Sequence, residues 1–178
     1  MDEKETQEGT ICCLKRESQV HLAWKTKKIC KNKWNGYGGG IEPNEKPRNA
    51  AVRELKEETG EKEPGDNRGV IARPEDLKKV AEVFYHNTKA DGSSFLVHCH
   101  IYLLYKWTGE IEETEVMVRP TWFNDDNVPY EDMPPGDIDY FPYILKGQKL
   151  KAHVYLGPFQ QEKLRETEIE FVEGFENE

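Results

Sequence analysis

Cysteine is scarce, and none of it occurs in a spacing typical of metal or redox sites. The 178 residues contain Cys12, Cys13, Cys30 and Cys99, and no two of these form a C-x-x-C pair. Adjacent Cys12 and Cys13 would face opposite sides of a strand. We therefore expect reduced thiols that are buried as small hydrophobic side chains, not disulfides.

Excess positive charge and long apolar runs are also lacking. The net charge of −9 argues against general affinity for a nucleic-acid backbone or an anionic lipid surface, because both bind basic proteins. No apolar run approaches a membrane span, and the acidic start MDEKETQEGT is unlike a signal or transit peptide. We expect a cytoplasmic protein without a membrane or stable nucleic-acid partner, and the sequence leaves its oligomeric state open.

The length suits one well-buried domain and is short for two. We expect a flexible leader over residues 1–9, a single domain over 10–172 and an acidic tail over 173–178. The segment 61–78 reads as a surface insertion that ends in a short helical start at 74–77.

Alternating and β-branched segments predict a mixed sheet, and capped segments predict helices on either side of it. Strands are expected at Thr10–Leu14, Gln19–Trp24, Lys79–His86, Phe95–Tyr105, Val116–Phe123 and His153–Leu156. Helices are expected at Lys46–Thr59, Asp137–Lys146 and Gln160–Glu166. The fold class is therefore α+β, as an α/β/α sandwich. His98 and His100 share one strand face, but without a third ligand in view we expect strand packing and not a zinc site.

The segment from Gly39 to Gly60, GGIEPNEKPRNAAVRELKEETG, carries the most information. Asn44 suits an N-cap, Pro47 the first turn and Gly60 the C-terminal stop of a helix. At about 100° per residue, three carboxylates on this helix fall within a sector of roughly 100°. They belong to Glu54, Glu57 and Glu58.

Such a cluster needs open water or a counter-ion, because like charges at these spacings destabilise a helix. Oxygen ligands suit Mg²⁺, with Mn²⁺ as a substitute. Helical spacing alone favours a solvated acidic face, which is common in a chain rich in glutamate. The full pattern is more specific, since Gly39, Glu45 and Arg53-Glu54-Leu55-Lys56-Glu57-Glu58-Thr59-Gly60 resemble the Nudix box, G-x5-E-x7-R-E-U-x-E-E-x-G-U, where U is aliphatic. Glu61 departs from it at the last position.

The similarity extends from about residue 10 to 171 and is closest to the oxidised-purine nucleoside triphosphatases, the 8-oxo-dGTP diphosphatases. Three further stretches carry this resemblance. They are Lys33-Trp34-Asn35-Gly36-Tyr37-Gly38-Gly39, Arg119-Pro120-Thr121-Trp122-Phe123 with Val128-Pro129-Tyr130-Glu131-Asp132-Met133, and Tyr140-Phe141-Pro142. It implies a Nudix-type sandwich with a catalytic loop-helix-loop.

The resemblance also implies residue roles. Metal ligands would be the Gly39 carbonyl with Glu54, Glu57 and Glu58. Arg53 would orient a carboxylate, with Glu45 as a partner, and Glu57 or Glu58 would help deprotonate the attacking water. Nucleotide contacts would come from Thr10, Lys25, Asn35 and Asp137, the last two at the base edge. From the residues alone, Asn35 also suits a turn before Gly36, and Asp137 suits an N-cap.

This chain departs from the family's purine pocket at several positions. Pro134 stands where the family has a tryptophan, and Gly136 stands where it has an aspartate. Tyr85 and Asn87 replace phenylalanines, and Met117 replaces an acidic residue. Tyr140, Tyr85 or Trp122 could supply another stacking surface, and Glu113 or Glu115 could replace the acidic group.

The resemblance implies Mg²⁺-dependent hydrolysis of a nucleoside triphosphate, such as 8-oxo-dGTP, to a monophosphate and pyrophosphate. One alternative is another nucleoside diphosphate derivative as substrate, such as ADP-ribose, a dinucleoside polyphosphate or an RNA cap. A second alternative is a Nudix-like module that binds nucleotide without catalysis.

Overall fold

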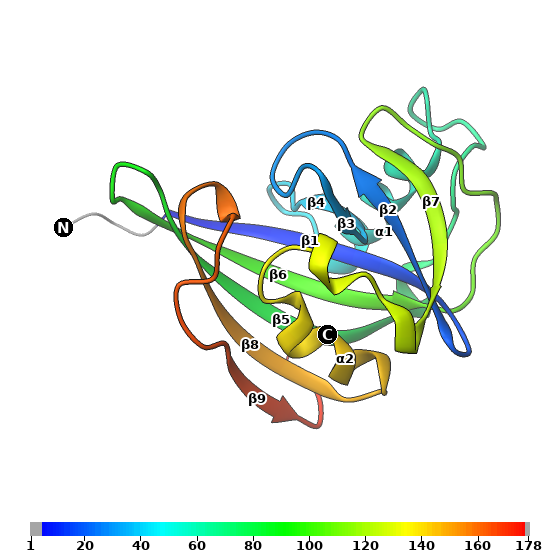
Figure 1. The fold of residues 1–178 in the computed structure, drawn as a ribbon. Helices are drawn as coiled ribbons and strands as arrows, with labels where there is room; N and C mark the ends of the chain where they lie inside the picture. The colour runs from blue at the N-terminus through cyan, green and yellow to red at the C-terminus, as the bar shows by residue number, and fades with distance from the viewer. Residues whose placement is uncertain (1–4, 177–178) are drawn as a thin grey trace.

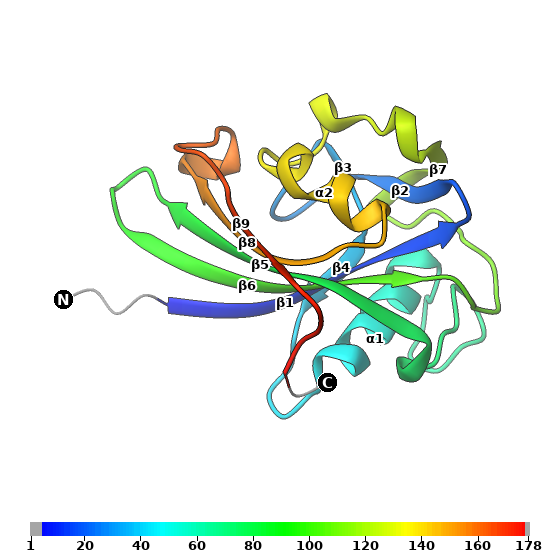
Figure 2. The same ribbon diagram turned by 90° about the horizontal axis from the view of Figure 1, so that it is seen from below.

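The computed structural model describes residues 5–176, and it has a mixed β-sheet with one α-helix on each face. Figure 1 shows the long strands crossing the molecule, and Figure 2 shows α1 and α2 on opposite sides of them. The helices are α1 (Pro47–Thr59) and α2 (Asp137–Leu145). The expected α/β/α sandwich and its mixed sheet are confirmed.

Within the described residues the strands are joined in the order β3-β2-β1-β6-β5-β8-β9, while β4 pairs with β1 and β7 with β2. The strands are β1 (Glu5–Arg16), β2 (Gln19–Lys25), β3 (Lys33–Asn35), β4 (Tyr37–Gly40), β5 (Leu77–Thr88), β6 (Ser94–Leu104), β7 (Met117–Asn124), β8 (Lys149–Leu156) and β9 (Glu168–Val172). The pairs β1–β6 and β5–β8 are parallel, and the others are antiparallel.

Strand β1 organises the site because it belongs to two branches of the sheet. Along one edge it pairs with β6 from Glu5 to Leu14. Along its other edge it pairs first with β4, where Thr10 lies opposite Gly39, and then with β2 at Lys15 and Arg16. The glycine-rich approach to α1 is therefore hydrogen-bonded directly to the strand that carries Thr10.

Each helix buries an apolar flank against one face of the sheet. Ala51 and Leu55 of α1 pack in a core that includes Cys12, whereas Tyr140 of α2 packs in a second core that includes Cys13. The two cysteines thus face opposite sides, as expected from strand alternation. The four cysteines are free thiols, and Cys30 is the one that is only partly buried.

Several expected boundaries are wrong. Residues 5–9 form the first part of β1, so the leader cannot include them, and residues 1–4 lie outside the described part of the chain. The short strands β3 and β4 were not expected, because neither length nor alternation marks them. The edge strand β9 was also not expected, although its sequence EIEFV alternates charged and apolar residues. Residues 173–176 of the expected tail lie outside any helix or strand, and 177–178 are not described.

The helix expected at Gln160–Glu166 is also wrong. A 3-10 turn, η4 (Pro158–Gln160), is followed by a chain that returns along β8, with the N–H of Leu164 donating to the Tyr155 carbonyl at 2.8 Å. Phe159 has φ 58°, which interrupts a right-handed helix. A bridge between Leu156 and Lys163 completes this reversal of the chain.

The segment 61–78 is less superficial than expected. Its short helical start is present as η1 (Pro74–Asp76). Val70 is fully buried, and its N–H donates to the Thr59 hydroxyl at 2.7 Å. The segment therefore seals the C-terminal end of α1. Neither α-helix in residues 5–176 has the length and apolar character needed to span a bilayer.

Candidate active site

Helix α1 presents the acidic cluster, and proline defines where it begins. Pro47 is its first residue, and Lys46 before it has the extended conformation that a following proline favours. The expected N-cap at Asn44 is wrong, because Asn44 has φ 65° within a turn that Glu45 closes onto the Glu42 carbonyl. Gly60 ends the helix at φ 146°, as expected.

Arg53 lies at the centre of the carboxylate cluster. Its Nε and Nη2 donate to the two oxygens of Glu45 at 2.9 and 2.8 Å, which is a bidentate pair. Its Nη1 donates to Glu54 at 2.7 Å and lies 3.6 Å from Glu57. Hydrogen bonding to Arg53 lowers the pKa of Glu45. The predicted Arg53–Glu45 partnership is thus present in the structure.

Glu58 and Glu57 sit in different surroundings on the same helix. Glu58 is buried, and its Oε2 accepts the Gly38 N–H at 2.9 Å. Burial raises the pKa of Glu58 to about 7, against the opposing effects of this hydrogen bond and of Lys25. The Glu57 side chain is 45% exposed, and partial burial and the Glu54 charge raise its pKa. One carboxylate is enclosed and the other is open to water.

The glycines of β4 are required because side chains would not fit. A Cβ on Gly38 would lie 1.9 Å from the Thr10 carbonyl oxygen, and one on Gly39 would lie 2.5 Å from the Glu54 carboxylate. The Gly39 backbone therefore lies directly against Glu54. The Gly39 carbonyl and the carboxylates of Glu54, Glu57 and Glu58 are hard oxygen donors of the kind that suits Mg²⁺.

A cavity of about 260 Å³ opens beside Gly39 and Glu54. Thr10, Lys25, Asn35 and Asp137, which come from four different elements, all line it. The Thr10 hydroxyl is buried without a hydrogen-bond partner in the structure, so it is available to a ligand. The Asn35 Oδ1 accepts the Gly36 N–H at 2.9 Å, so the turn role and a place in the cavity wall coexist.

Asp137 is the first residue of α2, and it ends a chain of hydroxyl contacts. The Tyr140 hydroxyl donates to its Oδ1 at 2.9 Å and lies 2.7 Å from the Tyr85 hydroxyl. Burial raises the pKa of Asp137 to about 7. The N-cap alternative for Asp137 is wrong, because Gly136 holds that position at φ 95°. A Cβ on Gly136 would lie 2.6 Å from Val154, so an aspartate has no room there.

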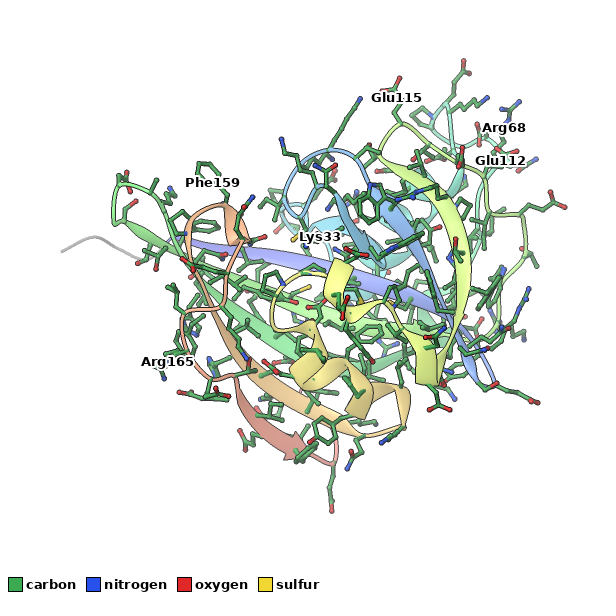
Figure 3. All side chains as sticks on the ribbon, in the orientation of Figure 1. Lys33, Arg68, Glu112, Glu115, Phe159 and Arg165 are labelled. Carbon is green, nitrogen blue, oxygen red and sulfur yellow. The ribbon has the colours of Figure 1, made fainter. Side chains whose placement is uncertain are left out.

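Of the alternative pocket residues, Tyr85 lines the cavity, whereas Tyr140 is buried behind it. Trp122 lies elsewhere, under the Arg16 guanidinium at 4.0 Å. Glu113 accepts the Arg119 N–H, and Glu115 pairs with Lys27 at the exposed site labelled in Figure 3. Neither glutamate lines the cavity, and Met117 is buried in the core.

Sequence reasoning missed Cys30 and Gln160 in the cavity wall. The Cys30 thiol donates to the Gln160 Oε1 at 2.9 Å, and the Gln160 Nε2 donates to Asn87 at 2.7 Å. These residues come from loops far apart in sequence, and no local signal marks them. Their contacts link three separate segments of the chain in the cavity wall.

A wider groove of about 1150 Å³ adjoins the cavity and shares Lys28, Ile29, Cys30, Pro134 and Gln160 with it. Three more lysines line this groove, and they are Lys31, Lys33 and Lys89. Phe159, 85% exposed, projects from η4 at its edge (Figure 3). The groove is thus locally basic on an acidic protein.

The sandwich, with its acidic helix behind a glycine-rich strand, has the fold of the MutT proteins. The chain resembles the MutT protein of Bacillus halodurans with a TM-score of 0.72 at 20% identity, covering 92% of this chain and 97% of that one. The MutT protein of Methanosarcina mazei Go1 resembles it with a TM-score of 0.56 at 14% identity, covering 83% and 95%. These likenesses show the fold.

The NUDIX domain matches residues 5–144, and the chain belongs to the Nudix family. It is 30% identical to the oxidized purine nucleoside triphosphate hydrolase of Mus musculus over 81% of this chain and 83% of that protein. It is 29% identical to the protein of the same name from Danio rerio, with the same coverage. The chain is therefore a Nudix hydrolase that acts on phosphoanhydride bonds.

Proposed function

We propose that this protein hydrolyses a nucleoside triphosphate, with oxidised purines such as 8-oxo-dGTP as the substrate class, to the monophosphate and pyrophosphate in a Mg²⁺-dependent reaction. One observation carries the proposal. A single cavity is lined both by the buried acid Asp137 and the amide Asn35 and by Glu54 and Gly39 of the box. A nucleotide bound there has its base beside polar groups and its phosphates beside the box.

At the phosphate end, Glu54, Glu57, Glu58 and the Gly39 carbonyl would hold Mg²⁺. The bound ion supplies charge neutralisation at the phosphate oxygens and a lowered pKa of the attacking water. Arg53 holds Glu54 in place through the 2.7 Å hydrogen bond, and Glu45 in turn fixes the guanidinium. Lys25, close enough to influence the pKa of Glu58, supplies positive charge for the phosphates.

We assign Glu57 the role of accepting the proton from the attacking water. Its carboxylate is the one in contact with solvent, where a water molecule reaches it. Glu58 is enclosed, and one of its oxygens is already occupied by the Gly38 N–H. Glu58 is therefore a ligand that the backbone holds in position.

At the base end, Asp137 and Asn35 would read the edge of the purine. With a pKa near 7, Asp137 carries its proton in part of the molecules at neutral pH, so it can donate as well as accept a hydrogen bond. The Tyr140 hydroxyl donates to the Asp137 Oδ1 and contacts the Tyr85 hydroxyl, so the two tyrosines hold the Asp137 carboxyl group in place, while Gly136 leaves no room for a second carboxyl group. Thr10 adds a free hydroxyl.

A substrate panel tests the proposal. Pyrophosphate and monophosphate release is measured with 8-oxo-dGTP, dGTP, ATP and ADP-ribose, each with and without Mg²⁺. The proposal predicts Mg²⁺-dependent release that is fastest for the oxidised purine. Stabilisation by nucleotide without any product would instead support a binding module.

A second candidate substrate class is a longer nucleotide, such as a dinucleoside polyphosphate or a capped RNA end. The lysine-lined groove that continues from the cavity supports it, because it could hold a chain that extends beyond one nucleotide. Faster turnover of a dinucleoside polyphosphate than of any nucleoside triphosphate would favour this class.

A further inference from the structure

Away from the box, two histidines and a glutamate converge on the sheet face that α1 leaves uncovered. His98 and His100 lie two residues apart on β6, so their side chains share that face. Glu8 on β1 is the register partner of His98, which places its carboxylate beside both rings. In Figure 2 the first half of β1 extends beyond α1, so no helix covers this part of the face.

The contacts within this cluster are close to metal-ligand geometry. The Glu8 Oε1 lies 3.1 Å from the His98 Nδ1, and its Oε2 lies 3.1 Å from the His100 Nε2. The three ligand atoms lie within 4.8 Å of one another. A tetrahedral Zn²⁺ with bonds near 2.0–2.2 Å holds its ligand atoms about 3.4 Å apart. Only small side-chain shifts separate the cluster from that arrangement.

The surroundings of the cluster orient its ligands. The second nitrogen of His98, Nε2, lies 3.3 Å from the Glu82 Oε2, the carboxylate–histidine arrangement that typically supports a metal-bound imidazole. Lys79 donates to the other Glu82 oxygen at 2.7 Å, so Glu82 is engaged as a support and not as a further ligand. Phe84 stacks on His98 with ring centroids 4.4 Å apart and fixes its plane.

His100 is directed at the same point. It is 8% exposed, and its Nε2 faces Glu8, whereas its buried Nδ1 has no hydrogen-bond partner in the structure. The contact with Glu8 is thus the polar interaction that orients this ring. Glu8 offers the third donor atom that the sequence could not identify, because it lies on a strand distant in the chain.

We propose that Glu8, His98 and His100 form a transition-metal site that takes Zn²⁺ or a similar ion and fastens β1 to β6. Two imidazoles and one carboxylate select ions of this class, whereas the oxygen-only box selects Mg²⁺. Its role would be structural, because Glu8 and its neighbours Gln7, Gly9 and Thr10 all line the substrate cavity, and the bound ion would hold that wall in place.

Zn²⁺ is titrated calorimetrically into chelator-treated protein in excess Mg²⁺, which keeps the box carboxylates occupied. We expect one Zn²⁺ per chain, with affinity at least about tenfold weaker in His98→Gln and His100→Gln. Glu82→Gln acts through His98 and should weaken binding by about 10–100-fold.

His153→Gln is the matched control, since His153 stacks on Phe84 from the other side and lies outside the cluster. Its affinity should equal that of wild type.

The visible absorption of bound Co²⁺ reports directly on metal ligands, so a substitution that only disturbs the packing of β1 against β6 would not change it. Wild type should give the visible absorption of a tetrahedral Co²⁺ site, Glu82→Gln should keep it at higher Co²⁺, and His98→Gln should lose it. Glu8→Gln, at an exposed position, tests the third ligand without disturbing the core. Equal Zn²⁺ affinity in wild type, His98→Gln and Glu8→Gln, or the lack of any site in excess Mg²⁺, would overturn the proposal.

Discussion

The two ends of the cavity differ in how closely they follow the Nudix pattern. At the phosphate end, Arg53 joins Glu45 and Glu54 in one network, and Gly39 leaves room for Glu54. At the base end, Pro134 and Gly136 replace the residues that the resemblance implies. In the proposed function, the chemistry would depend on one helix and its preceding strand, whereas recognition of the base would depend on residues from several elements that can change separately.

The largest expected effect is at the phosphate end. Glu57→Gln and Glu58→Gln each remove one charge from the donor set without changing side-chain shape. Loss of several kcal/mol of transition-state stabilisation should lower kcat by roughly 10³-fold or more. Steady-state release of pyrophosphate measures the effect.

Glu63→Gln serves as the matched control, because Glu63 is exposed just beyond the end of α1. It should retain wild-type turnover. Full activity in both Glu57→Gln and Glu58→Gln would contradict the assigned mechanism.

At the base end, Asp137→Asn should increase the free energy of unfolding while it weakens recognition of the purine base. A buried acid whose folded pKa is raised to about 7 loses folding stability as pH rises from about 4 to 7, because the folded protein then binds more protons than the unfolded chain. Removing this charge should add about 2–4 kcal/mol to the free energy of unfolding at pH 8, and almost none near pH 4.

Denaturant unfolding of wild type and Asp137→Asn at both pH values measures this difference. The same variant should lose about tenfold in kcat/KM for the purine substrate, as expected for one charged hydrogen bond. Asp139→Asn is the control in the same helical turn, where the Asp139 carboxylate accepts Lys163 at 2.6 Å outside the cavity. A pH-independent stability change in Asp137→Asn would show that its carboxyl group is not buried in solution.

Arg53→Lys separates positioning from substrate binding. Lysine keeps the charge but loses the bidentate pair with Glu45, which should lower kcat by about 10–100-fold. KM for the nucleotide should stay near wild type, since Arg53 does not line the cavity. Kinetics of Arg53→Lys, Glu45→Gln and the double variant measure the coupling.

The kcat of the double variant should be little lower than that of either single variant, because both substitutions break the same Arg53–Glu45 interaction. Arg68→Lys, at the exposed arginine labelled in Figure 3, controls for the substitution itself. Fully additive losses would place Arg53 and Glu45 in separate roles.

The smallest expected effect concerns the last position of the box. Glu61 replaces an aliphatic residue, and the structure gives it a different partner, the Lys56 ammonium at 2.8 Å. Glu61→Ile restores the family residue type and should change the free energy of unfolding by less than about 1 kcal/mol, since ion pairs near the surface contribute little. Thermal unfolding and turnover measure it, and a large loss of turnover would mean that this pair shapes the metal site.

The sequence located the helix that carries the box glutamates well, because the signals for that helix are local. The spacing of Arg53, Glu54, Glu57 and Glu58 determines one helix face, and proline and glycine mark where the helix begins and ends. Six strands were located by alternation. The short strand β4 escaped because a glycine-rich segment has no alternating side chains, although its backbone contacts with β1 build the site, and the three-residue β3, which pairs with β2, is too short to show alternation.

The base end was harder to predict because its neighbours are distant in sequence. The contact of Asp137 with Tyr140 is within one helical turn, but the Tyr85 contact that extends it comes from β5. Cys30 and Gln160 meet only after the chain has folded. The reason for glycine at 136 required coordinates, since Val154 occupies the space that a side chain would need.

The most direct test of the central claim measures products from 8-oxo-dGTP with wild type and Glu57→Gln at increasing Mg²⁺. The account predicts equal amounts of monophosphate and pyrophosphate from wild type, dependent on Mg²⁺, and almost none from Glu57→Gln, although the variant still binds the nucleotide. A wild-type protein that is folded and stabilised by nucleotide and Mg²⁺ but releases no product from any phosphoanhydride would contradict it.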